Sequence, residues 1–197
     1  MSFSMNTDII KAKLPKDMRL ICAGESSRVV YVGIAVKAGT RDEHDDESGM
    51  AHFLEHMSFK GTERRSKESI IRLMESVGGE INAFTGKEET IFYCTCENRY
   101  LKRAVDILLD IVFHSTYPQE ELQHEAEVVI DEIESYNDSP AELIYDDFES
   151  LLFENHPLGR SILGRAESLR TYRTSDVKSF ADRMYNPENC LMFVYGA

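Results

Sequence analysis

The order of strand-like and helix-like segments limits the folds open to this 197-residue chain more than any other feature. Short stretches of two-residue apolar alternation occur near both ends and in the middle, and blocks of helical periodicity lie between them. Strands and helices that come in blocks, without strict alternation, are typical of α+β domains with a mainly antiparallel sheet packed with helices. No linker rich in Pro, Gly or Ser and no internal repeat divides the sequence, so we expect one domain over residues 1–197.

The strand-like segments are joined by turn-like sequences. Arg19–Cys22 and Val29–Val36 flank Gly-Glu-Ser-Ser, which predicts a hairpin. Glu80–Thr85 and Thr90–Cys96 flank Gly-Lys-Glu-Glu and predict a second hairpin. A final strand is expected at Leu191–Tyr195.

The helix-like segments carry apolar residues three and four positions apart. We expect helices over residues 49–57, 66–77, 98–112, 119–136, 139–153 and 176–185. The acidic segment Arg41–Gly49 reads as a solvated loop, with Ser48 as a cap for the helix that follows.

Charge and hydropathy exclude several classes of function. The formal net charge of −13 disfavours nucleic acid, whose phosphates would be repelled, and favours basic peptides or divalent metal ions as partners. No apolar run approaches the roughly 18–20 residues that a membrane span requires. Neither a signal peptide nor a transit peptide is visible at the start, so the cytoplasm is the expected location.

The sequence HFLEH, from His52 to His56, is the strongest sign of chemistry. On a helix, histidines four residues apart project from one face, about one turn apart, and can bind the same metal ion. Glu55 lies beside them without replacing a ligand, as a general base for a metal-bound water must. The alternative interpretation is a helix with two surface histidines and a solvated glutamate.

A catalytic zinc ion takes three protein ligands and keeps one position open, so a third ligand must come from elsewhere. Glu125 and Glu132 are seven residues apart on the helix expected at 119–136, which places them on one side, flanking an apolar stripe. We therefore expect both to point toward the interior, where a cation would offset the cost of a buried carboxylate.

Four motifs in order resemble the pitrilysin/insulinase family of zinc peptidases, most closely bacterial peptidases similar to the mitochondrial processing peptidase β subunit. The resemblance runs from about Leu20 to the end of the chain. Its motifs are HFLEHMSFKGT, GGEINAFTGKEETIFY, EVVIDEIESYNDSP and HPLGRSILG.

The resemblance implies a role for several residues. His52, His56 and Glu132 would bind one zinc ion, with Glu55 as the general base. Glu125 matches a second acidic position that the family keeps close to the site and is counted with Glu55 as catalytic, although Ala126 stands where an Arg usually follows.

The same resemblance gives residues 82–85 the place of an edge strand, to which an extended peptide adds itself as a further strand. Asn82, Ala83 and Phe84 are the substrate contacts expected there; an ordinary strand is the alternative.

Family members are generally about twice as long, with two similar domains that close around the peptide. We therefore expect the N-terminal zinc-binding domain of such an enzyme, either cut from a longer chain or made as a separate subunit. The two function hypotheses are a zinc endopeptidase domain, weakly active alone, and a non-catalytic peptide-binding or scaffold subunit. A second homologous domain or subunit is the expected partner, and a homodimer is the alternative because a half-enzyme should expose apolar surface.

Overall fold

The computed structural model describes residues 9–196 and contains one six-stranded sheet. Its strand order is β1-β2-β6-β3-β5-β4, and every neighbouring pair is antiparallel except β2 and β6. The mainly antiparallel α+β prediction is therefore confirmed. The strands are β1 (Ile9–Lys13), β2 (Arg19–Ala23), β3 (Val29–Val36), β4 (Glu80–Thr85), β5 (Thr90–Glu97) and β6 (Cys190–Tyr195).

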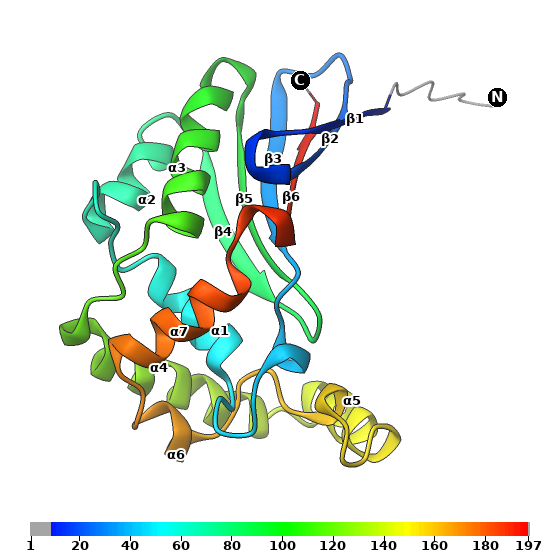
Figure 1. Cartoon of the computed structure of the whole chain (residues 1–197), viewed down its shortest axis with the longest axis vertical. Coiled ribbons are helices and arrows are strands. Elements are labelled where there is room, and N and C mark those ends of the chain that lie inside the picture. The colour runs from blue at the N-terminus through cyan, green and yellow to red at the C-terminus, as the bar shows by residue number, and fades with distance from the viewer. Residues whose placement is uncertain (1–8, 197) are drawn as a thin grey trace.

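The helices lie beside the sheet and beyond one end of it (Figure 1). Helices α2 and α3 stand against the sheet, whereas α4, α5 and α6 gather at the end away from the chain's C-terminus. The helices are α1 (Met50–Ser58), α2 (Lys67–Glu75), α3 (Leu101–Phe113), α4 (Gln119–Asn137), α5 (Pro140–Leu152), α6 (Ala166–Leu169) and α7 (Thr174–Met184).

The predicted hairpin between Arg19–Cys22 and Val29–Val36 is wrong. Strand β6 lies between β2 and β3, parallel to the first and antiparallel to the second. β2 instead forms its hairpin with β1, which the sequence analysis did not predict. A strand from the far end of the chain can take this place because sheet order depends on long-range packing, which a local turn sequence does not determine.

The core lies between the sheet and the helices. On β3, Val30, Val32, Ile34 and Val36 are fully buried, as two-residue alternation on a half-covered sheet requires. Helix α3 packs on β3 and β5 with a stripe of buried residues at helical spacing. That stripe consists of Ala104, Ile107, Leu108 and Ile111.

The opposite face of the sheet exposes apolar and aromatic side chains. The register places Tyr31 beside Tyr195, with ring centroids 6.3 Å apart, and both are close to half exposed. The ring of Phe193 lies over Gly33, where an added Cβ would come within 2.3 Å of it. We call this surface the open sheet face; it is formed by Ile21, Tyr31, Phe84, Tyr93, Phe193 and Tyr195.

Candidate metal centre

Helix α1 carries the HFLEH sequence, and its orientation is fixed by burial. Met50, Phe53, Leu54 and Met57 are almost fully buried, and the helix packs against α4 and β4. The remaining face, with both histidines, therefore points along the groove between these two elements.

The start of α1 is held by a residue that the sequence analysis assigned to a solvated loop. Glu43 is only 4% exposed, and its carboxylate accepts hydrogen bonds from the backbone N–H groups of Gly49 and Ala51, at 3.1 and 3.0 Å. It satisfies donors that a helix start leaves unpaired. The prediction that the Ser48 side chain caps this helix is wrong. Gly49 occupies the N-cap position, and no side chain at that position forms a capping hydrogen bond.

Three possible ligand atoms converge at the groove. The Nε2 atoms of His52 and His56 lie 3.2 Å apart, and Glu132 Oε2 lies 3.8 Å from the first and 3.7 Å from the second. Tetrahedral zinc with ligand bonds of about 2.05 Å separates its ligand atoms by roughly 3.3 Å. Two imidazoles and a carboxylate are also a donor set that catalytic zinc takes, so these residues fit a zinc ion.

The prediction that Glu125 and Glu132 both point toward the interior is correct for Glu125 only. Glu125 is 3% exposed and points inward as expected. The side chain of Glu132 is 46% exposed and lines the groove. The seven-residue spacing predicts that both glutamates lie on one side of the helix. It does not predict how far the neighbouring elements cover that side.

Glu125 lies behind His56 and away from the convergent atoms. The Nδ1–H of His56 donates a hydrogen bond of 2.8 Å to Glu125 Oε1, and Lys60 forms an ion pair with Oε2 of the same carboxylate. Burial raises the pKa of Glu125, but the hydrogen bond from His56 and the ion pair with Lys60 outweigh it, and the net shift is downward. A ligand histidine that donates its second N–H to a carboxylate is held in the tautomer that a metal needs.

The histidines themselves differ electrostatically. Burial, together with the neighbouring His56, lowers the pKa of His52 to about 3, so its ring is neutral. Burial also lowers the pKa of His56, but Glu125 and the other nearby carboxylates outweigh it and the net shift is upward. A neutral ring is the form that binds metal.

Glu55 occupies the wall of the groove facing β4. It is buried, and the Thr85 hydroxyl donates a hydrogen bond of 2.5 Å to its Oε2. Burial raises the pKa of Glu55, while the bond from Thr85 lowers it, and the net shift is upward. A raised pKa makes a carboxylate a better proton acceptor.

The groove itself has a volume of about 460 Å³ and runs beside an edge of the sheet. The predicted edge strand at residues 82–85 is confirmed as part of β4. Pairing with β5 places Ala83 and Thr85 on the helix side, facing α1, and Asn82 and Phe84 on the open sheet face. The groove is lined by His52, Glu55, His56, Asn82, Ala83, Phe84, Thr85, Glu132, Tyr136, Asp146, Ile162 and Leu163.

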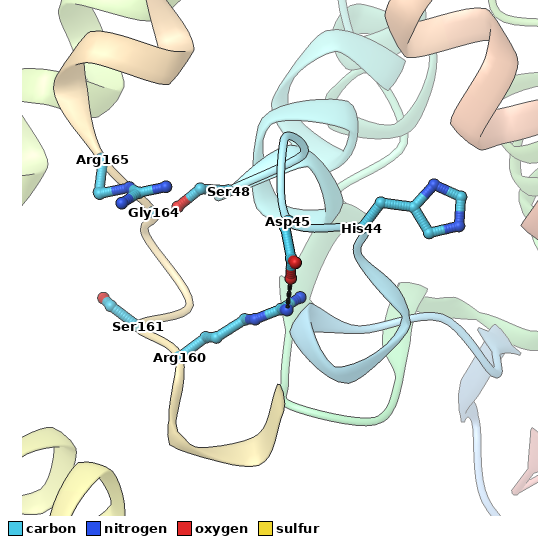
Figure 2. Close-up of a pocket in the computed structure, with 7 residues that line it drawn as sticks. All are labelled: His44, Asp45, Ser48, Arg160, Ser161, Gly164 and Arg165. Carbon is cyan, nitrogen blue, oxygen red and sulfur yellow. Dashed lines mark hydrogen bonds and ion pairs between the residues drawn. The ribbon is translucent and has the colours of Figure 1, made fainter. Parts of the chain in front are cut away.

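The loop after α5 closes one side of this groove and is tied to the loop before α1. Arg160 donates a hydrogen bond to the carbonyl of Glu43. It also forms an ion pair with Asp45 (Figure 2). Gly164, with a φ of +74°, approaches so closely that an added Cβ would lie 2.4 Å from the Cα of Gly49. The HPLGRSILG motif thus contacts the loop at the start of the helix that carries HFLEH.

Sequence reasoning missed three residues of this centre, namely Glu43, Thr85 and Lys60. Hydroxyls and single charges in strands and loops carry no periodic signal, and only the tertiary structure brings them to the helix. The remaining histidines of the described residues have exposed side chains; they are His44, His114, His124 and His156.

A helix with two convergent histidines, a carboxylate from a second helix and a glutamate beside a sheet edge define a metallopeptidase-like domain. A family profile described as "Insulinase (Peptidase family M16)" matches residues 20–166. The chain belongs to this insulinase family.

Relatives in the family carry zinc-protease names. The chain is 38% identical over 167 residues to an uncharacterized zinc protease of Rickettsia felis, covering 85% of this chain and 40% of that protein. It is 31% identical over 185 residues to a probable mitochondrial-processing peptidase subunit beta of Arabidopsis thaliana, covering 93% of this chain and 35% of that protein.

A solved structure supports the fold. A protease from Helicobacter pylori superposes with a TM-score of 0.90 at 22% identity, over 97% of this chain and 47% of that one. The chain therefore spans less than half the length of these relatives. Across residues 9–196, none of the helices is long and apolar enough to cross a membrane.

Proposed function

We propose that residues 1–197 form the zinc-binding, N-terminal domain of an endopeptidase. The observation that carries the proposal is the convergence of His52, His56 and Glu132 beside the buried Glu55. One zinc ion per chain would bind to these three side chains. The zinc-protease names of the relatives support the same assignment.

Bound zinc would polarise the scissile carbonyl and make a water molecule acidic enough to lose a proton near neutral pH. Glu55 accepts that proton and passes it to the leaving amine, and the Thr85 hydroxyl holds the carboxylate in place for both transfers. Glu125, which the sequence analysis counted as catalytic, acts in this proposal through His56.

The substrate is proposed to be an extended peptide that pairs with the free edge of β4. The backbone of Asn82, Ala83 and Phe84 would bind it, because the side chains of Asn82 and Phe84 point away from the metal ligands. Main-chain pairing at an edge accepts many sequences. The net charge of −13 favours basic peptides among them.

The partner is proposed to be a second homologous domain or subunit that completes the groove. The chain spans 40% of its Rickettsia relative, and its open sheet face offers an apolar surface for packing. A homodimer would cover the same surface. Alone, the domain is expected to have low activity. The cytoplasm is the compartment in which we expect it to act.

The second candidate function is a peptide-binding or scaffold subunit that performs no cleavage. It is supported by the free edge of β4, because main-chain pairing there would bind a peptide without any cleavage step. The two functions differ in what happens to a peptide after it binds.

The test is a single-turnover assay in which the zinc-loaded chain is in excess over internally quenched peptides blocked at both ends. The parent chain is expected to cleave slowly, E55Q to bind zinc and peptide but not cleave, and H124A, which changes an exposed histidine, to match the parent. Peptide binding without cleavage by the parent, in a preparation with full zinc, would favour the scaffold function.

A further inference from the structure

Lys60 lies just beyond the end of α1 and reaches back toward the metal centre. Its ammonium group pairs with Oε2 of Glu125, while Oε1 of that carboxylate accepts the Nδ1–H of His56 at 2.8 Å. The three side chains form one continuous line, from the cation through the carboxylate to the ring. Lys60 is 22% exposed at its side chain and Glu125 4%, so the pair is largely removed from water.

The charges around Glu125 show why this carboxylate needs Lys60. A buried carboxylate is costly without a cation, and a neutral imidazole supplies a hydrogen bond but no charge. The other carboxyl groups that line the groove belong to Glu55, Glu132 and Asp146, and none of them can supply a positive charge. Lys60 therefore supplies the positive charge that lets the carboxylate remain charged and fixed behind His56.

The lysine side chain has no second structural task in the contacts of the described residues. The backbone N–H of Lys60 bonds to the carbonyl of Met57 at 3.1 Å and finishes the helix whichever side chain is present. Removing the side chain should therefore leave the end of α1 intact and alter chiefly the carboxylate that it contacts.

The second ligand of α1 shows why this support matters. His52 Nδ1 is buried and has no hydrogen-bond partner among the described residues. The Nδ1 side of this ring is therefore held by packing alone, whereas Nδ1 of His56 donates a hydrogen bond to Glu125. The orientation of the ligand pair thus depends on the line from Lys60 to His56.

We propose that Lys60 is a positioning residue for the metal, acting through Glu125 to fix the ring and tautomer of His56 so that Nε2 faces the ion. The inference rests on the proposed function, because it takes His56 as a ligand. It assigns to Lys60 a role that is separate from the ligands and from the general base.

The test is zinc affinity, measured by competition with a chromophoric chelator on the chain itself, with the absorption spectrum of the cobalt-substituted protein as a second readout. Removing support of this kind typically weakens metal binding about 10- to 100-fold. We expect that loss in K60M and in K60Q, an altered cobalt spectrum in both, and partial recovery in K60R, which keeps the charge.

The matched control is K67M. Lys67 pairs with Glu121 and joins α2 to α4, as Lys60 joins α1 to α4, but its side chain is 45% exposed and it touches no proposed ligand. K67M is expected to bind zinc like the parent. Thermal unfolding of the metal-free variants separates a loss of folding from a loss of affinity, and K60Q provides the measurement should K60M not fold.

A double-substitution cycle tests the route of the effect. If Lys60 acts through Glu125, E125Q alone and K60M with E125Q together should bind zinc equally weakly. Parent-like affinity in K60M and K60Q, or a double variant weakened by the product of the two single effects, would overturn the inference. A parent chain that binds no zinc would overturn the proposed function as well, so the two failures can be told apart.

Discussion

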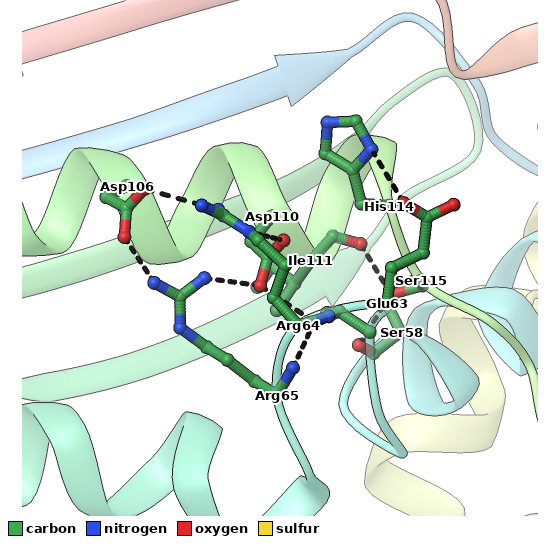
Figure 3. A network of polar contacts seen from close by, with 10 residues as sticks. Ser58, Glu63, Arg64, Arg65, Asp106, Asp110, Ile111, His114 and Ser115 are labelled. Carbon is green, nitrogen blue, oxygen red and sulfur yellow. Dashed lines mark hydrogen bonds and ion pairs between the residues drawn. The ribbon is translucent and has the colours of Figure 1, made fainter.

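Asp110 is a fully buried carboxylate in the last turn of α3, and its contacts fix the loop that follows α1 (Figure 3). Thr62 donates to it at 2.7 Å, and Arg64 and Arg65 both pair with it. This arrangement connects the end of the HFLEHMSFKGT motif to the core helix. Every polar atom of the carboxylate has a partner, so the cluster is a structural anchor.

D110N should lower the free energy of unfolding by about 2 kcal/mol, because it removes the charge from a buried group while its arginine partners remain partly exposed. The control is D106N, which meets the same arginines from a side chain that is 50% exposed and should cost less than about 1 kcal/mol. Urea unfolding at pH 7 measures both. Equal costs in the two variants would contradict the anchor role of Asp110.

The contribution of Asp110 to the free energy of unfolding should depend on pH. Burial raises the pKa of Asp110, but Thr62, Arg65 and Arg64 outweigh it and the net shift is downward. A carboxyl with a lowered folded-state pKa contributes stability above its unfolded pKa of about 3.9 and loses it as the pH falls through the folded value. The difference between parent and D110N should therefore shrink in unfolding curves recorded below pH 4; a constant difference would contradict the assignment.

At the scale of elements, the start of α1 depends on the contact between two backbone segments. Gly164 and Gly49 both have positive φ and meet with no room for a side chain. G164A should destabilise the chain by about 2–3 kcal/mol, since it adds a backbone clash to the strain at positive φ. It should also weaken zinc binding, because the loop before the helix would shift.

Gly78 supplies the control for G164A. It has a φ of +69°, but an added Cβ would meet nothing within 4 Å. G78A should cost only about 1 kcal/mol, the strain of the backbone alone, and leave zinc binding unchanged. Comparison of the two variants by thermal unfolding isolates the contact, and equal shifts would show that Gly164 matters only through its φ.

Most helices and strands could be predicted from the sequence because apolar periodicity is local. The prediction at 119–136 agrees with α4 to within a residue, and the strand at Val29–Val36 is β3 itself. Strand order could not be predicted, since β6 enters between β2 and β3 from the other end of the chain. Nor could Glu43, whose burial depends on the helix start folding over it.

For the candidate site, the helical spacing of His52 and His56 was enough to predict that they converge. The third residue, Glu132, came from a resemblance together with the spacing of α4, and the structure brings it to the same point. The role of Glu132 as a ligand stays a prediction, and so do the roles of Glu55 and Glu125 in catalysis. Thr85 escaped prediction because its bond to Glu55 joins a strand to a helix 30 residues away.

At the scale of the whole molecule, the open sheet face should make the isolated chain associate. Tyr31 is 49% exposed and Tyr195 40%, and they lie side by side on an apolar surface. Y31E is expected to reduce association while changing the free energy of unfolding by less than about 0.5 kcal/mol. Sedimentation velocity over a range of concentrations measures the change.

The control is Y145E on α5, a tyrosine that is 71% exposed and lies away from the sheet. It should leave association unchanged if the open sheet face is the contact. A parent chain that stays monomeric at all concentrations would contradict this prediction, and a Y145E variant that alone becomes monomeric would move the contact to α5.

The central claim is that this domain binds one zinc ion through His52, His56 and Glu132. Zinc content by elemental analysis, on the parent chain and on H52A and E132Q after equal exposure to zinc at neutral pH, tests it most directly. We predict one zinc per parent chain and much less in both variants. A parent chain without zinc, or variants that retain it fully, would contradict the account.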